Sequence, residues 1–145
     1  MIAIAKYNYT IDIVVRNFIE EQIEYYHENI RYIEEVKAEA IPSQISQYGP
    51  RAGSSFDSEK RPTEDIAIRR NPQYLIETER IVKVIGSVLD KLSDQDKELI
   101  RLKYWTAGLT PEGIALKLNL GRTTVYERLN NILVEIGRRL GYINL

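Results

Sequence analysis

The chain has 145 residues, a net charge of −1, 43% hydrophobic and 28% charged residues, and no cysteine. This length and composition fit one domain, or two small ones, of an ordinary globular protein. The lack of cysteine excludes disulfides and thiolate zinc sites, and no apolar run is long enough to span a bilayer. No basic segment followed by an apolar stretch stands at the start, so we expect a cytoplasmic protein without membrane association.

Charge is distributed unevenly along the chain. Residues 1–90 contain 11 Lys and Arg against 15 Asp and Glu, a net of −4, whereas residues 91–145 contain 9 against 6, a net of +3. This asymmetry is typical of a protein in which only the C-terminal part contacts phosphate. A net of +3 also occurs in many other domains of this size, so the charge alone favours nucleic acid only weakly.

The first element predicted is a long amphipathic helix over residues 10–40. No Pro or Gly interrupts this range, and apolar side chains recur three or four residues apart. The stripe consists of Ile11, Val15, Phe18, Ile19, Ile23, Tyr26, Ile30, Ile33 and Val36. A helix this long exceeds what a small globule needs, so its stripe is expected to pack on a helix of this chain or of another copy. Residues 1–40 are interpreted as an oligomerisation segment that gives a homodimer or a higher homo-oligomer.

A linker and a second helical region are predicted next. Residues 41–62 are rich in Pro, Gly and Ser, which breaks any periodicity and indicates a flexible linker. Residues 63–145 are then expected to form a helical bundle. One helix is predicted to start with Thr63 as its N-cap, and another at Asn71-Pro72, with Asn as N-cap and Pro as the first helical residue.

The following helix carries a start signal and a stop signal. Ser93-Asp-Gln-Asp96 resembles a capping box, in which the Ser hydroxyl accepts from the third amide and the carboxylate reaches back. Gly108 is expected to end this helix as a residue after its C-cap.

Residues 109–129, LTPEGIALKLNLGRTTVYERL, predict two short helices joined by a tight turn. Thr110 is a good N-cap and Pro111 a good first helical residue, while Gly121 can supply either a left-handed turn residue or the next N-cap. The second helix is expected to bury Val125, Leu129, Ile132, Leu133, Ile136 and Leu140. This pattern is typical of a helix-turn-helix whose second helix enters a major groove of DNA.

The outward side chains of that second helix suit base recognition. The candidate base-reading residues are Arg122, Thr123, Tyr126, Glu127 and Asn130. Arg can bind guanine through two hydrogen bonds, Asn can bind adenine, Glu can accept from cytosine N4, and the Thr methyl can meet a thymine methyl. The candidate phosphate contacts are Lys117, Thr124, Arg128 and Lys103, with Arg138 and Arg139 as further candidates.

Two stretches carry a resemblance to known families. The segment from LSDQDKELIRLKYW through LTPEGIALKLNLGRTTVYERLNNILVEIGRRLG, about residues 93–141, resembles region 4 of bacterial sigma factors. The layout of the whole chain, with its TEDIAI element, resembles phage-encoded late-gene activators of the RinA and ArpU type from prophages of Gram-positive bacteria. The resemblance implies an activator that binds promoter DNA, switches on late phage operons in the bacterial host cell, and has RNA polymerase as a further partner.

Two other functions remain open at this point. One is a phage small terminase subunit, a ring-forming protein of DNA packaging that also carries a helix-turn-helix. The other is a sigma-like module that binds RNA polymerase without reading DNA. An enzyme is not expected, because the chain contains no HExxH, GxxxxGK[ST], GxSxG or GxGxxG motif and its single histidine, His27, lies within a predicted helix. Neither a metal site nor a cofactor is expected.

Overall fold

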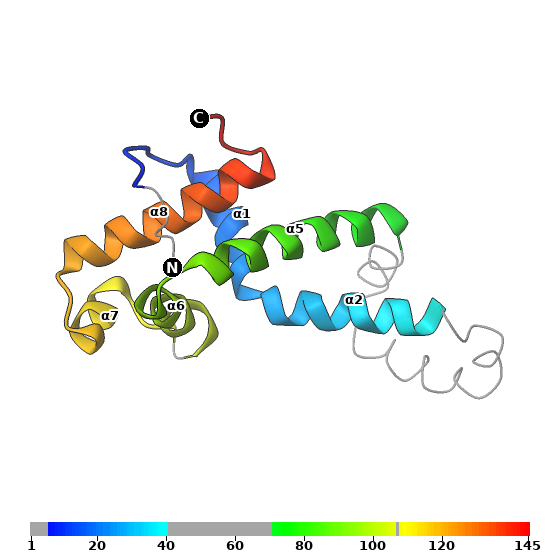
Figure 1. The fold of residues 1–145 in the computed structure, drawn as a ribbon, viewed down its shortest axis with the longest axis horizontal. Coiled ribbons are helices and arrows are strands. Elements are labelled where there is room, and N and C mark those ends of the chain that lie inside the picture. The colour runs from blue at the N-terminus through cyan, green and yellow to red at the C-terminus, as the bar shows by residue number, and fades with distance from the viewer. Residues whose placement is uncertain (1–5, 41–70, 107) are drawn as a thin grey trace. The chain divides into compact units, whose positions relative to one another are not determined.

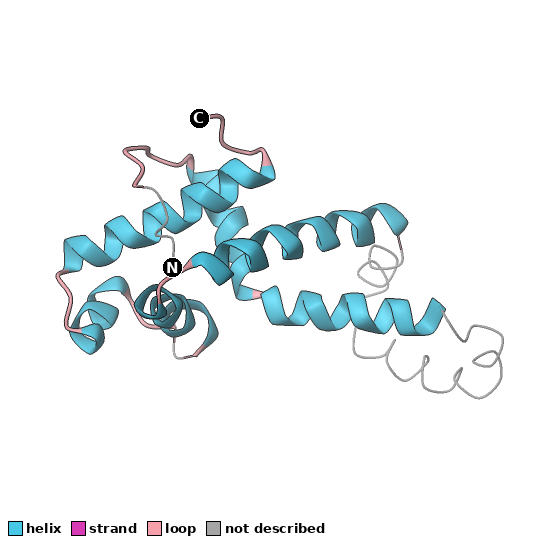
Figure 2. Ribbon diagram, in the orientation of Figure 1, coloured by secondary structure: helices cyan, strands magenta, loops and turns pink. Residues whose placement is uncertain are grey.

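All regular structure in the described part of the chain is helical (Figures 1 and 2). A computed structural model describes residues 6–40, 71–106 and 108–145. The helices are α1 (Ile13–Glu24), α2 (Tyr26–Ala40), α5 (Pro72–Lys91), α6 (Asp94–Ile100), the short π-helix η1 (Arg101–Trp105), α7 (Pro111–Leu118) and α8 (Arg122–Leu140). The all-α prediction is therefore confirmed. The predicted linker at 41–62 and the helix start predicted at Thr63 lie outside the described residues.

The chain divides into two compact units. One consists of Met1–Tyr26 together with Lys83–Leu145, and the other of His27–Val82. This division differs from the domains expected from the sequence, because α1 packs on α8 and η1 of the C-terminal region. Part of the apolar stripe that was assigned to oligomerisation is thus buried within the chain itself.

The smaller unit brings α2 against the first part of α5. The ring of Tyr32, which is buried, lies 5.6 Å from the ring of Tyr74 in an edge-to-face arrangement. Lys37 Nζ lies 2.9 Å from Glu79 Oε2. The start of α5 agrees with its sequence signal, since Asn71 Oδ1 accepts a hydrogen bond from the amide of residue 73 at 2.8 Å.

The single helix predicted over residues 10–40 is corrected to two helices that are separated at Tyr25. The backbone of Tyr25 has φ −94° and ψ 14°, well away from α-helical values. The indole of Trp105 donates to the carbonyl of Ile23 at 2.8 Å, and in a continuous helix that carbonyl would accept from the amide four residues on. Asp12 caps α1 by accepting from the amide of Val14 at 3.1 Å. The apolar stripe continues through the break, so the periodicity does not reveal it.

The larger unit is built on aliphatic side chains from all of its helices. Fully buried members are Ile19, Ile23, Ile85, Val88, Leu92, Leu99, Ile100, Leu102, Ile114, Val125, Leu129, Ile132, Leu133, Val134 and Ile136. Each such side chain contributes on the order of 1.5–3 kcal/mol through burial. A Cβ on Gly137 would lie 2.6 Å from Ile143 Cδ1 and 3.0 Å from Ile19 Cδ1, so the lack of a side chain there allows α1 to approach α8 closely.

Candidate nucleic-acid interface

The helix-turn-helix forms through local signals that agree with one another. Thr110 Oγ1 accepts from the amide of Gly113 at 3.1 Å and caps α7. Asn119 adopts the left-handed conformation with φ 58° and ψ 47°, and Gly121 is the N-cap of α8 with φ −71°. Of the two roles open to the glycine, it therefore takes the N-cap. The amide of Leu120 donates to the carbonyl of Ala115 at 2.9 Å and closes the turn.

The buried face of α8 agrees with the predicted one. All six side chains expected to face inward are buried, namely Val125, Leu129, Ile132, Leu133, Ile136 and Leu140. They pack on α7, α6 and α1, and α7 contributes the buried Ile114 and Ala115. The opposite face of the first turns of α8 is consequently free of core contacts.

Four of the candidate base-reading residues lie exposed on that face. They are Arg122, Thr123, Tyr126 and Glu127. A carboxylate on α7 holds two of them, because Glu112 Oε2 lies 3.4 Å from Arg122 Nε and accepts from the Tyr126 hydroxyl at 3.0 Å. The Arg122 guanidinium lies 5.8 Å from the centre of the Tyr126 ring. The hydrogen bond to its own backbone amide, followed by that from Tyr126, lowers the pKa of Glu112, which is thus charged at neutral pH.

Two other candidates form contacts within the protein. The Asn130 side-chain amide, which is half-buried, donates to the carbonyl of Tyr9 at 3.1 Å. Arg128 Nη1 donates to Gln95 Oε1 at 2.6 Å and lies 3.4 Å from Asp96 Oδ1, at the start of α6. Their predicted DNA contacts require these side chains to exchange an internal partner for the nucleic acid.

The remaining phosphate candidates occupy different surroundings. Lys117 is exposed in the last turn of α7, and Thr124 is half-buried in the first turn of α8. Lys103 lies on η1, where its Nζ is 4.0 Å from Glu20 Oε2 and 5.2 Å from the centre of the Tyr104 ring. The structure therefore places Lys117 and Thr124 beside the turn, while Lys103 faces α1.

A feature that the sequence did not indicate is an extended N-terminal arm, residues 6–12, that lies along α8. The Tyr7 amide donates to Asn131 Oδ1 at 2.8 Å, and Ile11 is buried. A groove of about 550 Å³ is lined by the arm, by Arg16 and by the outer face of α8. Its lining consists of residues 6–11, Arg16, Thr123, Tyr126, Glu127, Asn130 and Asn131. Four of the five candidate base-reading side chains, all except Arg122, thus form one wall of this groove.

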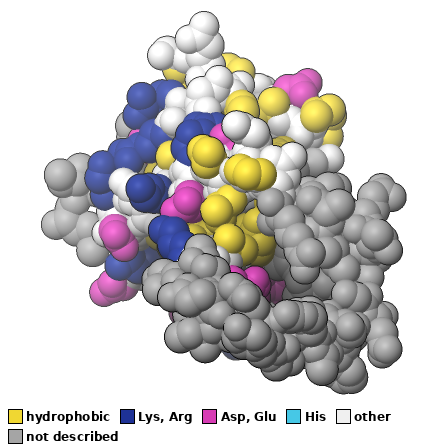
Figure 3. All heavy atoms as spheres, turned by 90° about the vertical axis from the view of Figure 1, so that its right-hand side faces the viewer, with side chains coloured by type: hydrophobic (Ala, Val, Ile, Leu, Met, Phe, Trp, Pro, Cys, Tyr) yellow, Lys and Arg dark blue, Asp and Glu magenta, His cyan; other side chains and the backbone are white. Residues whose placement is uncertain are grey.

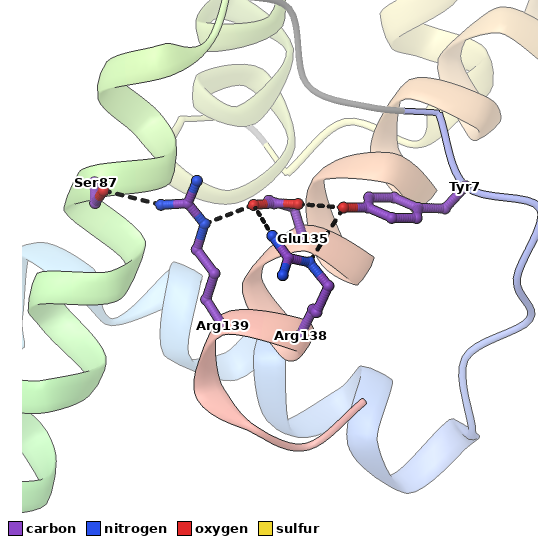
Figure 4. A network of polar contacts seen from close by, with 5 residues as sticks. All are labelled: Tyr7, Ser87, Glu135, Arg138 and Arg139. Carbon is purple, nitrogen blue, oxygen red and sulfur yellow. Dashed lines mark hydrogen bonds and ion pairs between the residues drawn. The ribbon is translucent and has the colours of Figure 1, made fainter. Parts of the chain in front are cut away.

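A buried carboxylate fastens the arm to α8 (Figure 4). Glu135, only 4% exposed, accepts hydrogen bonds from the Tyr7 hydroxyl, from Arg138 Nη2 at 3.0 Å and from Arg139 Nε at 2.5 Å. Burial acts to raise the pKa of Glu135, but the hydrogen bonds from Tyr7, Arg139 and Arg138 outweigh it and lower the pKa to about 2. Arg139 also donates to Ser87 Oγ of α5 at 3.1 Å. The two arginines are engaged in this network, which is a structural role besides the phosphate contacts considered from the sequence.

Charged side chains of both signs occur on the face of the molecule that is drawn in Figure 3. In the face drawn in Figure 3, Lys and Arg side chains lie next to Asp and Glu side chains, with apolar side chains beside them. Within residues 6–40, 71–106 and 108–145, no helix has the length and apolar content to cross a membrane. The same residues contain no group of three or more His, Asp or Glu side chains placed to hold a metal ion.

A comparison with protein families decides the membership of the chain. The sequence model of the family described as "Protein of unknown function (DUF722)" matches residues 10–138. The chain belongs to this family. Comparison with curated proteins and with solved structures finds no match. The DUF722 match extends from the end of the arm into the last turn of α8, and so includes the helix-turn-helix and most of the groove.

Proposed function

We propose that this chain is a transcription regulator that binds double-stranded promoter DNA in a sequence-specific manner, with α8 in the major groove. The observation that carries the proposal is the exposed face of the first turns of α8. Its opposite face is fixed by burial on α7, and its outward side chains are of the types that read base edges.

The outward side chains of α8 suit different bases. Arg122 offers two hydrogen bonds to guanine O6 and N7, and Glu127 accepts from cytosine N4. The methyl group of Thr123 suits the methyl group of thymine. Asn130 reads adenine only after its amide releases the carbonyl of Tyr9, so we place it at the edge of the contact.

Glu112 keeps the reading side chains in place before DNA arrives. When Arg122 turns to a base, the Glu112 carboxylate still has its own backbone amide and the Tyr126 hydroxyl as partners. The exchange therefore does not leave a bare carboxylate beside the DNA, and Tyr126 remains oriented.

Resemblance to activators of the RinA and ArpU type supports a finer assignment. It favours an activator of phage late genes that works in the bacterial host cell and has RNA polymerase as a further partner. One module this small buries little DNA surface, so two half-sites and a homodimer or higher homo-oligomer belong to the proposal. Since α1 is packed inside its own unit, we assign the pairing to α2, where Ile30, Ile33 and Val36 are half-buried.

The test combines site selection with one substitution. Genomic fragments are enriched on the immobilised protein, and fluorescence anisotropy then measures affinity for the enriched site and for random duplex at two salt concentrations. Wild-type protein is expected to prefer the site at both. Arg122→Ala is expected to lower that preference by about 1–3 kcal/mol, while Lys117→Ala weakens binding to both duplexes equally.

Other outcomes identify the competing functions. Preference that survives in Arg122→Ala contradicts the base-reading assignment. Equal, steeply salt-dependent binding to every duplex, with a particle mass of eight or more subunits by light scattering, indicates the small terminase. Capture of RNA polymerase without binding to any duplex indicates the module that does not read DNA.

A further inference from the structure

We propose that the groove between the N-terminal arm and α8 receives the sugar-phosphate backbone of the DNA strand beside the bases that α8 reads. In this arrangement Arg16 and Lys6 are its cationic contacts. The inference rests on the proposed function and adds two DNA-binding residues that lie more than a hundred positions from α8 in the sequence.

The groove lies on the face of α8 that carries the reading side chains. Thr123, Tyr126 and Glu127 follow the spacing that places side chains on one side of a helix, and all three line the groove. A duplex that brings base edges to these side chains brings its own phosphates alongside them. Phosphate and sugar receive half or more of the hydrogen bonds in protein–DNA interfaces, and these contacts set the register of the reading helix.

The lining of the groove suits a phosphodiester. Its charged side chains are two cations, Lys6 and Arg16, and one carboxylate, Glu127. The amide of Asn8 and the hydroxyls of Tyr9 and Thr10 add polar groups from the arm. A groove of about 550 Å³ that is open to solvent and lined by two cations, one carboxylate and several hydrogen-bonding side chains can accept a charged backbone.

Arg16 can turn to a phosphate without disturbing the fold. Its Nε lies 3.6 Å from Glu20 Oε1 on the same helix, in a pair that is partly exposed. Glu20 also accepts from the Tyr104 hydroxyl at 2.6 Å, so its carboxylate keeps a strong partner when Arg16 leaves. The planar guanidinium can then donate two parallel hydrogen bonds to one phosphate.

The arm is held in place before DNA arrives. Tyr7 is fixed at its amide by Asn131 and at its hydroxyl by Glu135, which Arg138 and Arg139 hold in turn (Figure 4). Lys6 precedes this anchor directly. The wall that carries Lys6 therefore does not need to be ordered on binding, and preorganisation of this kind favours affinity.

The experiment measures the salt dependence of binding for Arg16→Ala, with full-length protein, the enriched site and random duplex. Loss of one phosphate contact is expected to weaken binding to both duplexes alike. The salt dependence is expected to become less steep, with the magnitude of the slope of log K against log salt reduced by about 1. Arg16→Lys keeps the charge and is expected to keep the slope. Lys83→Ala removes one exposed charge outside the groove and serves as the matched control.

The outcomes separate this inference from the proposed function. An unchanged slope in Arg16→Ala, with selective binding by the wild type, overturns the inference and leaves the function standing. A wild type that binds no duplex overturns the function. If Arg16→Ala loses its helical circular dichroism, the same salt dependence is measured for Lys6→Ala. Lys6 is exposed in the non-helical arm, so its removal leaves the core intact.

Discussion

The two halves of α8 differ in what surrounds them. In residues 122–130 only Val125 and Leu129 are buried, whereas every residue from Ile132 through Gly137 is buried. The second half is enclosed by other helices of the larger unit, α1 among them, and by the N-terminal arm, whereas the first half packs one face on α7 and leaves the opposite face exposed. The second half of α8 thus holds the helix in the core, and the first half presents side chains to solvent. The stability of the unit resides in one half and its proposed recognition in the other.

The largest expected effect comes from truncating the enclosed half. Leu133 is completely buried, so Leu133→Ala removes apolar contacts and leaves a cavity. We expect the free energy of unfolding to fall by about 2–5 kcal/mol in urea titrations followed by circular dichroism. Thr123→Ala in the first half of α8 is expected to change the free energy of unfolding by no more than about 0.5 kcal/mol. Equal losses of unfolding free energy in the two variants would contradict this difference between the two halves of α8.

The next effect concerns the buried carboxylate of the enclosed half. Its hydrogen bonds lower the pKa of Glu135 from 4.5 to about 2 in the folded state, so the unfolded chain binds more protons between these values. The resulting stabilisation is fully present above about pH 4.5 and is lost as the pH falls through 2. At 1.36 kcal/mol per pKa unit it amounts to about 3 kcal/mol.

Glu135→Gln tests this contribution. The variant is expected to unfold more easily at pH 7 and to lose less stability than the wild type when the pH is lowered from 5 to 2, as measured by urea titration at each pH. Glu127→Gln changes an exposed carboxylate on the same helix and is expected to leave the free energy of unfolding at pH 7 within about 0.5 kcal/mol. A parallel pH dependence in Glu135→Gln and the wild type would refute the role of this network.

The smallest effect is expected at Glu112 of α7, which lies beside Arg122 in the first half of α8. Glu112→Gln removes the charge that holds Arg122 while keeping a similar shape. Because the pair is exposed, stability is expected to change by no more than about 0.5 kcal/mol. Removal of a negative charge near the phosphates is expected to strengthen binding to all duplexes a few-fold. Because Arg122 is held less firmly, the ratio of the affinity for the enriched site to that for random duplex is expected to fall. Anisotropy on both duplexes measures this ratio, and a larger ratio in the variant would show that Glu112 does not orient the reading side chains.

The parts of the fold that were predictable are those with local causes. Thr110 and Pro111 start α7 through one hydrogen bond and one fixed dihedral angle, both encoded within a few residues. The buried face of α8 follows from apolar side chains at helical spacing. For the same reason the exposed positions of Arg122 and Tyr126 could be read from the sequence.

The parts that were missed depend on distant partners. At the end of α1 the carbonyl of Ile23 accepts a hydrogen bond from the indole of Trp105, 82 residues away. Glu135 looks like an ordinary surface residue of a helix, and it is buried because Tyr7, 128 residues away, covers it. No local pattern contains such pairings. The groove at the candidate site has the same origin, since its two walls come from opposite ends of the chain.

The packing of Ile19 against Gly137 also determines the order in which this protein can fold. α1 leaves the ribosome more than a hundred residues before the part of α8 that covers its apolar face. The larger unit can close only after α8 has been synthesised, and bringing two segments so far apart in sequence together has a cost in loop-closure entropy. Until then α1 exposes Ile19 and Ile23, which are buried in the folded protein, so the nascent chain is expected to be prone to aggregation.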